Sequence, residues 1–245
     1  MSAARPRRSP PVAIAARALA GIALVLGVVV PAARAAGAEA PPEHPRALRF
    51  DILRKGAVIG EHVMRFTDDG PRRIVNIEIR IKVTFASIPL FRYEHTSREV
   101  WQGGRLVALD TRTDDDGTHY RVTARAEGDH LVVDGRFGHL ILPGDLMPTS
   151  YWDRRMMLRS EALDSQRGRV VHLVITPPAP DTVEVDGAPA ETARYGVSGD
   201  LDMTLWYLPD GEWAKLVFEA KGAPIEYVRR AAGAAVDAPA TDGKP

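Results

Sequence analysis

A stretch of strict alternation, "IVNIEIRIKVTF" at residues 74–85, limits the possible folds of this chain more than any other feature. Apolar side chains occupy every second position from Val75 to Phe85, and Asn, Glu, Arg, Lys and Thr fill the positions between them. A period of two over eleven residues is typical of a β-strand with one dry and one wet face. Burial of each Ile or Val stabilises the fold by about 1.5–3 kcal/mol, so the register is strongly specified. A wet face favours an antiparallel sheet, because parallel sheets are covered on both sides.

Similar runs follow at short intervals along the chain, and turn residues separate them. Asp69-Gly70, Gly103-Gly104, Asp116-Gly117 and Asp134-Gly135 suit hairpin turns that need a positive φ. The pattern predicts a meander of about ten strands or more, and so many strands curl or split rather than stay flat. We therefore expect a mainly β domain over residues 47–230, built as a single curved antiparallel sheet in the form of a half-barrel or open barrel.

Residues 150–158 break the strand pattern. Ser150 followed by Asp153 resembles a capping-box start, and the residues that follow lack β-branched side chains. Trp152 and Met156 lie four positions apart and would share one side of a helix. The segment therefore predicts one short helix near residues 150–158, with an apolar surface that needs cover.

The stretch "LDMTLWYLPDGEWAKLVFEA", residues 201–220, reads as two strands around a Pro-Asp-Gly turn. A four-residue loop at 209–212 would place Leu205 opposite Leu216 on a wholly apolar core face. The same register pairs Met203 with Phe218 and Tyr207 with Ala214. Three large apolar residues then lie together on the opposite face: Trp206, Leu208 and Trp213.

An aromatic cluster of that size on an outer face needs either a cover or a use. Two covers are possible: the helix near 150–158 packed across that end of the sheet, or a bound ligand. Lys215 opposite Trp206 also permits a cation–π contact of purely structural value. On the ligand interpretation, the binding residues would be Tyr151, Trp152, Met156, Trp206, Leu208 and Trp213.

The first 35 residues have the order of a secretory signal peptide. Arginines precede a 13-residue apolar run, Ala18 to Val30, and Ala33-Arg34-Ala35 offers a cleavage point. The run is shorter than the roughly 20 residues that a membrane-spanning helix needs. We expect removal of residues 1–35 near Ala35, a disordered linker at 36–46, a disordered tail at 231–245, and a periplasmic or secreted bacterial protein with no integral membrane span.

The charge of the expected mature chain argues against a nucleic-acid partner. Removal of the leader takes away five arginines and leaves 27 Lys and Arg against 32 Asp and Glu, a net charge of −5. Nucleic-acid binding needs clustered positive charge to neutralise phosphates. There is no cysteine, so a lipid anchor on cysteine and thiol chemistry are both excluded.

No motif in the sequence supplies a recognised catalytic or metal site. The seven histidines lack the spacing of metal ligands, and His62 and His95, on predicted strands, read as hydrogen-bonded sheet histidines. The segment around Ser198 departs from the G-x-S-x-G pattern of a nucleophile elbow. We therefore expect no catalytic residues, no metal and no cofactor.

The C-terminal half carries the most specific family likeness. Its "SYW" at 150–152 and "GDLDMTLWYLPDGEWAKLVFEAKGAPIEYV" at 199–228 resemble an exported bacterial family known only as a domain of unknown function, with a Gly-Asp-Leu…Leu-Trp-Tyr…Gly signature. More remotely, "FDILRKGAVIGEHVMRF" and the Trp-Tyr hairpin are similar to periplasmic β-proteins of the lipoprotein-carrier type. That resemblance implies an open half-barrel closed by helices; fold does not imply function.

These observations lead to a working hypothesis of a non-catalytic exported protein that holds a lipid or other apolar or amphipathic small molecule in the concavity of its sheet. Two alternatives remain open. One is an envelope-directed hydrolase that uses a carboxylate or Ser150 in an unrecognised site. The other is a structural or interaction protein that uses a sheet edge or the Trp cluster.

Overall fold

The computed structural model describes residues 47–85 and 88–231, which all belong to the unit formed by residues 41–245. The expected signal peptide at 1–35 and linker at 36–46 lie outside the described residues, as does residue 232 onwards of the expected tail. Within the described part of the chain, no helix is long and apolar enough to cross a membrane.

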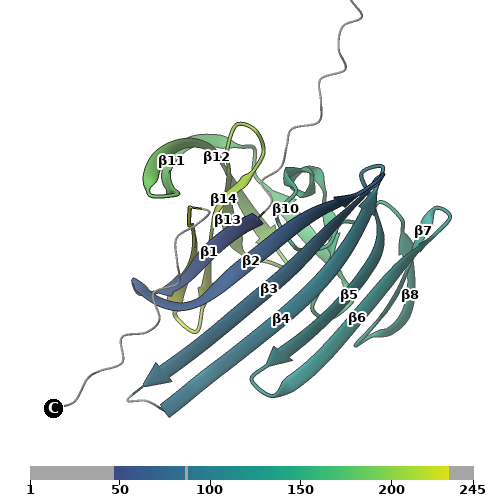
Figure 1. The fold of residues 1–245 in the computed structure, drawn as a ribbon, viewed down its shortest axis with the longest axis horizontal. Helices are drawn as coiled ribbons and strands as arrows, with labels where there is room; N and C mark the ends of the chain where they lie inside the picture. Colours follow the sequence, from purple (N-terminus) through teal and green to yellow (C-terminus); the bar gives the residue numbers. More distant parts are fainter. Residues whose placement is uncertain (1–46, 86–87, 232–245) are drawn as a thin grey trace, which may run out of the picture. The chain divides into compact units, whose positions relative to one another are not determined.

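The described residues form one antiparallel sheet of fifteen strands with almost no helix (Figure 1). This confirms the mainly β fold predicted from the alternating runs. The sheet is open and does not close into a barrel. The first eight strands are β1 (Ala47–Arg54), β2 (Ala57–Asp69), β3 (Arg72–Phe85), β4 (Ile88–Gln102), β5 (Arg105–Asp115), β6 (Thr118–Glu127), β7 (His130–Gly135) and β8 (Gly138–Pro143). The remaining strands are β9 (Glu161–Leu163), β10 (Val170–Ile175), β11 (Ala179–Val185), β12 (Ala188–Gly199), β13 (Met203–Tyr207), β14 (Trp213–Ala220) and β15 (Ala223–Arg229).

Strand β1 lies between two runs of neighbouring strands in the sheet, β2 to β8 on one side and β15 back to β9 on the other. It pairs with β2 on one side and with β15 on the other, so that β8 and β9 become the two far edges of the sheet. Strand β11 lies off this path and pairs only with β12, as a hairpin. Residues 144–160 connect β8 to β9 and therefore span from one edge of the sheet to the other.

The turn between β7 and β8, near one edge of the sheet, approaches the segment between β9 and β10, near the other edge, but the two do not pair as strands. The backbone N–H of Arg136 donates to the carbonyl oxygen of Arg167 at 3.1 Å. A Cβ added to Gly135 would lie 3.0 Å from the Cα of Gly168, and Gly168 itself has φ +72°. Glycine at both positions therefore permits a backbone approach that larger residues would obstruct.

The alternation of β3 decides which face of the sheet becomes the core. Val75 and Ile77 are buried, whereas Asn76 and Arg80 are exposed on the other face. The inward side chains of nearly all the strands meet in a single apolar cluster. Burial of the apolar face of β3 therefore fixes the register of this strand, as the alternation predicted.

The helix is shorter than expected and is of the 3-10 type, η1 (Arg154–Leu158). Asp153, not Ser150, caps it, because the Asp153 side chain accepts a hydrogen bond from the backbone N–H of Arg155. Tyr151 has φ +64°, a left-handed conformation that prevents a helix from starting at Ser150. Met156 and Met157 anchor η1 in the core.

Candidate functional site

A cavity of about 720 Å³ opens at one end of the curved sheet. We call it the inner cavity. Its size falls in the range of small-molecule sites, roughly 300–1,000 Å³. Apolar side chains from β3, β14 and β15 make up much of its wall: Ile77, Ile79, Ile81, Leu216, Phe218 and Ile225.

Strand register places two histidines in the wall of the inner cavity. Ile79 of β3 pairs with His62 of β2 on one side and with His95 of β4 on the other. The three side chains therefore form one inward row across three strands. His62 is 2% exposed and His95 is 4% exposed.

Both histidines are neutral near pH 7 because burial opposes their charged form. Burial, with a smaller repulsion from His95, lowers the pKa of His62 to about 3. Burial lowers the pKa of His95 to about 4, against a smaller opposing effect of Asp164. The Nδ1 atom of His95 lies 2.8 Å from the Thr113 hydroxyl. Both rings therefore offer neutral hydrogen-bonding groups.

The mouth of the inner cavity carries mixed charge. Asp200, Asp202, Glu219 and Lys221 are exposed there, and Arg54 is half-buried. These residues lie at or beside strand ends, where the chain turns. Ionised groups therefore surround the entrance, while the apolar wall lies deeper.

Glu99 is a buried carboxyl close to the inner end of the cavity. One of its oxygens accepts hydrogen bonds from the indole N–H groups of Trp101 (2.8 Å) and Trp152 (3.0 Å). Burial raises the pKa of Glu99, and the two indole donors partly offset this rise. The side chain of Ser150, which lines the inner cavity, lies next to this carboxyl. Ser150 and Trp152 thereby contact β4 through Glu99.

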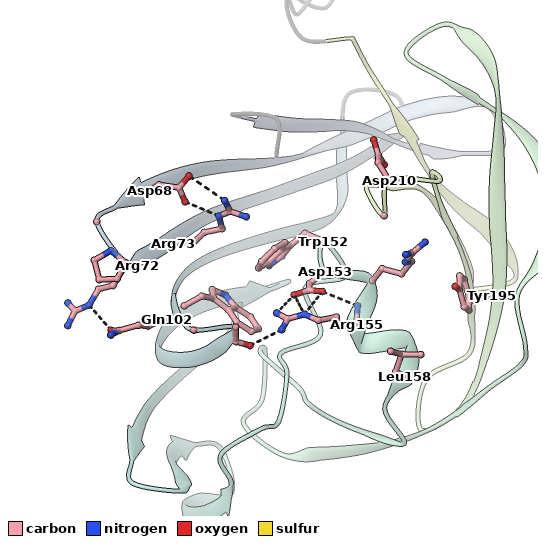
Figure 2. Close-up of a pocket in the computed structure, with 17 residues that line it drawn as sticks. Asp68, Arg72, Arg73, Gln102, Trp152, Asp153, Arg155, Leu158, Tyr195 and Asp210 are labelled. Carbon is pink, nitrogen blue, oxygen red and sulfur yellow. Dashed lines mark hydrogen bonds and ion pairs between the residues drawn. The ribbon is translucent and has the colours of Figure 1, made fainter. Parts of the chain in front are cut away.

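A second hollow, of about 920 Å³, lies at the opposite ends of the strands and is called the outer cleft (Figure 2). Several of its charged side chains are already paired. Arg73 Nε donates to Asp68 at 2.9 Å, and Arg155 Nε donates to Asp153 at 2.9 Å. Arg73 and Arg155 are therefore engaged by carboxylates of the cleft itself.

The structure separates the six residues expected to bind a ligand. Tyr151 lines the inner cavity and Trp152 lines the outer cleft. Met156 and Trp213 are buried in the main core. Trp206 and Leu208 belong to a separate small cluster.

Trp206 and Trp213 do not share a face, which corrects the expected pairing. A bulge between Trp206 and Tyr207 pairs Tyr207 with Trp213 instead of Ala214. The extra residue turns Trp213 into the core, where the centroid of its ring lies 4.2 Å from that of Phe50.

Trp206 is covered by the β11–β12 hairpin, and not by the helix or a ligand. Its indole N–H donates to Asp181 at 2.9 Å. The expected cation–π contact with Lys215 is present at 5.6 Å.

The sequence analysis did not predict that β4 points a row of mostly polar side chains towards the interior of the curved sheet. Tyr93, His95, Ser97, Glu99 and Trp101 alternate along this strand and face inward. Both faces of β4 carry polar residues, so its hydrophobic pattern does not identify the inner face. Its pairing with the strongly patterned β3 is the signal that could have identified it.

Metal-ligating side chains do not gather anywhere in residues 47–85 and 88–231: no group of three or more His, Asp or Glu there could hold an ion.

Comparison with known proteins supports the architecture. The chain is similar to a solved structure from Brucella abortus, a beta-barrel-like protein of domain of unknown function DUF1849. The TM-score is 0.54 at 12% identity, over 75% of this chain and 94% of that chain. At this identity the likeness concerns the fold alone.

No curated protein shows a significant match. The family described as a domain of unknown function (DUF6134) matches residues 50–230, which include almost the whole sheet. The chain therefore belongs to this family of domains of unknown function, as the Gly-Asp-Leu…Leu-Trp-Tyr…Gly signature led us to expect.

Proposed function

We propose that the protein is exported and holds an apolar or amphipathic small molecule in the inner cavity, without catalysing a reaction. The observation that carries this proposal is the cavity itself, with about 720 Å³ of space bounded largely by aliphatic and aromatic side chains. Such a site gains affinity mainly from burial of apolar ligand surface, and its few polar groups orient the ligand. The leader-like sequence of residues 1–35 supports the export part of the proposal.

A fluorescence titration with pyrene tests the binding part. Pyrene is a hydrocarbon whose emission changes in an apolar environment, and we expect a saturable response with one site per chain. Ile79 lies between the two cavity histidines, so Ile79→Trp would fill the space and should weaken pyrene binding by at least tenfold.

The matched control places the same bulky ring on the other face of the same strand. Lys82 is exposed on β3, and Lys82→Trp should leave pyrene affinity within about twofold of the unsubstituted protein. Equal affinities of all three proteins, or no saturable binding at all, would refute a ligand site in the inner cavity.

A further inference from the structure

Two residues that line the inner cavity carry buried hydrogen-bonding atoms that lack a protein partner. Within the described residues, neither nitrogen of His62 nor the hydroxyl oxygen of Tyr93 has a hydrogen-bond partner, and all three atoms are buried. The His62 ring meets the rings of Trp213 and Tyr227 edge-on, at 5.3 Å and 5.7 Å between centroids. Buried polar atoms of this kind are costly unless something bonds to them, and native proteins keep few of them.

Further polar groups line the same cavity. Ser150 and Ser165 are 8% and 4% exposed and line the inner cavity, together with His95. Their hydroxyls can both donate and accept hydrogen bonds, as can a tyrosine hydroxyl and a neutral imidazole. The cavity can therefore complement a ligand group that donates, accepts or does both.

The inner cavity offers an anion little compensating positive charge. Among the described residues that line the inner cavity, the cationic side chains are Arg54 and Lys221, and Lys221 is exposed at the mouth. Buried carboxyls lie beyond the wall instead: Glu99 beside Ser150, and Asp164, which acts on His95. Arg167, which acts electrostatically on Tyr93, is 3.5 Å from Asp115 and paired with it.

We propose, on the basis of the binding function proposed above, that the ligand of the inner cavity carries an uncharged hydrogen-bonding group, such as a hydroxyl or carbonyl, which bonds to the unpartnered atoms of Tyr93 and His62. An apolar alcohol, ketone or ester meets this description. A carboxylate or phosphate does not, because it would enter a desolvated region without a cation to pair with. The polar end of the ligand then lies inside the sheet, and its apolar part lies along the aliphatic wall.

Competition for bound pyrene tests this orientation. The full chain without residues 1–35 is loaded with pyrene at pH 8, and 1-decanol or sodium decanoate is added as competitor. The two competitors have the same chain length and differ in the group at its end. Decanol should bind at least about tenfold more tightly than decanoate, since one or two neutral hydrogen bonds and the avoided burial of a charge favour it.

Two variants locate the effect. Tyr93→Phe removes a single oxygen from the cavity wall and should weaken decanol binding by about threefold to tenfold, with pyrene affinity within about twofold. Tyr120→Phe is the matched control, because its hydroxyl bonds to Arg136 (3.4 Å) and does not line the inner cavity. It should leave the affinities for both competitors unchanged.

The results of these experiments distinguish a failure of the binding function from a failure of the uncharged-group proposal. If pyrene itself fails to bind, the proposed function fails. If pyrene binds but decanoate competes as well as decanol, or Tyr93→Phe leaves decanol affinity unchanged, the uncharged-group proposal is wrong while the binding function stands.

Discussion

The two cavity histidines make the stability of the fold sensitive to mild acid. His62 and His95 have folded-state pKa values of about 3 and about 4, whereas both have a pKa of about 6.5 in the unfolded chain. The pKa of each group is depressed on folding. Its contribution to stability is therefore present above about pH 6.5 and is lost as the pH falls from there towards the folded-state value.

The magnitude follows from proton linkage. Between about pH 7.5 and about pH 5, the unfolded chain takes up nearly one proton on each histidine, while the folded protein takes up almost none. Each histidine then lowers the free energy of unfolding by about 2 kcal/mol over this interval, and the pair lowers it by about 4 kcal/mol. A domain has only about 5–15 kcal/mol in total, so the loss is easily measured.

Urea unfolding followed by tryptophan fluorescence, repeated across this pH range, measures the effect. His62→Gln and His95→Gln should each reduce the loss of stability by about 2 kcal/mol, whatever their stability at pH 7.5. His119→Gln, at a histidine of β6 whose side chain is 76% exposed, is the control and should keep the full loss. If His62→Gln and His95→Gln retain the full acid sensitivity, these rings are protonated in the folded protein and the account of their burial is wrong.

The remaining predictions concern the tryptophans and the leader. Trp213→Ala should destabilise the fold by about 3–5 kcal/mol, because the ring is fully buried in the core, and chemical denaturation would measure it. Trp206→Phe should cost about 1 kcal/mol, the value of the lost hydrogen bond to Asp181, and an unchanged stability would contradict a contribution of that bond to the fold. Mass spectrometry of the protein recovered from a bacterial periplasmic extract should find Ala36 at the N-terminus; recovery of the intact residues 1–35 would refute the signal-peptide prediction.

Sequence reasoning succeeded where a buried face fixed the register. Leu205 pairs with Leu216 and Met203 with Phe218, as the apolar face of that hairpin predicted. Gly70, Gly104 and Gly117 have the positive φ expected of their turns. In these cases local preference and burial favour the same arrangement, so the sequence is sufficient.

Sequence reasoning failed where one extra residue or a long-range contact decided the outcome. The bulge that turns Trp213 inward leaves no clear signal in the residues themselves. The predicted turn at Asp134-Gly135 is displaced, since Gly138 has the positive φ and Gly135 instead lies against Gly168. His62 proved buried without a hydrogen-bond partner among the described residues, contrary to the expectation of a bonded sheet histidine.

The candidate site shows the same limit. Tyr151 was expected to contact a ligand and does line the inner cavity, but most of that wall comes from strands on both sides of β1. Ile79 and Phe218 lie far apart in the sequence and line the same cavity only because the two runs of strands belong to one curved sheet. No local pattern in the sequence encodes such a shared wall.

Native mass spectrometry of the protein purified from a periplasmic extract tests the central claim most directly. The account predicts a fraction of molecules with one bound small molecule that is uncharged at neutral pH and largely apolar, and predicts that Ile79→Trp, but not Lys82→Trp, abolishes this added mass. A protein that carries no added mass, or one that Ile79→Trp leaves fully loaded, would contradict it.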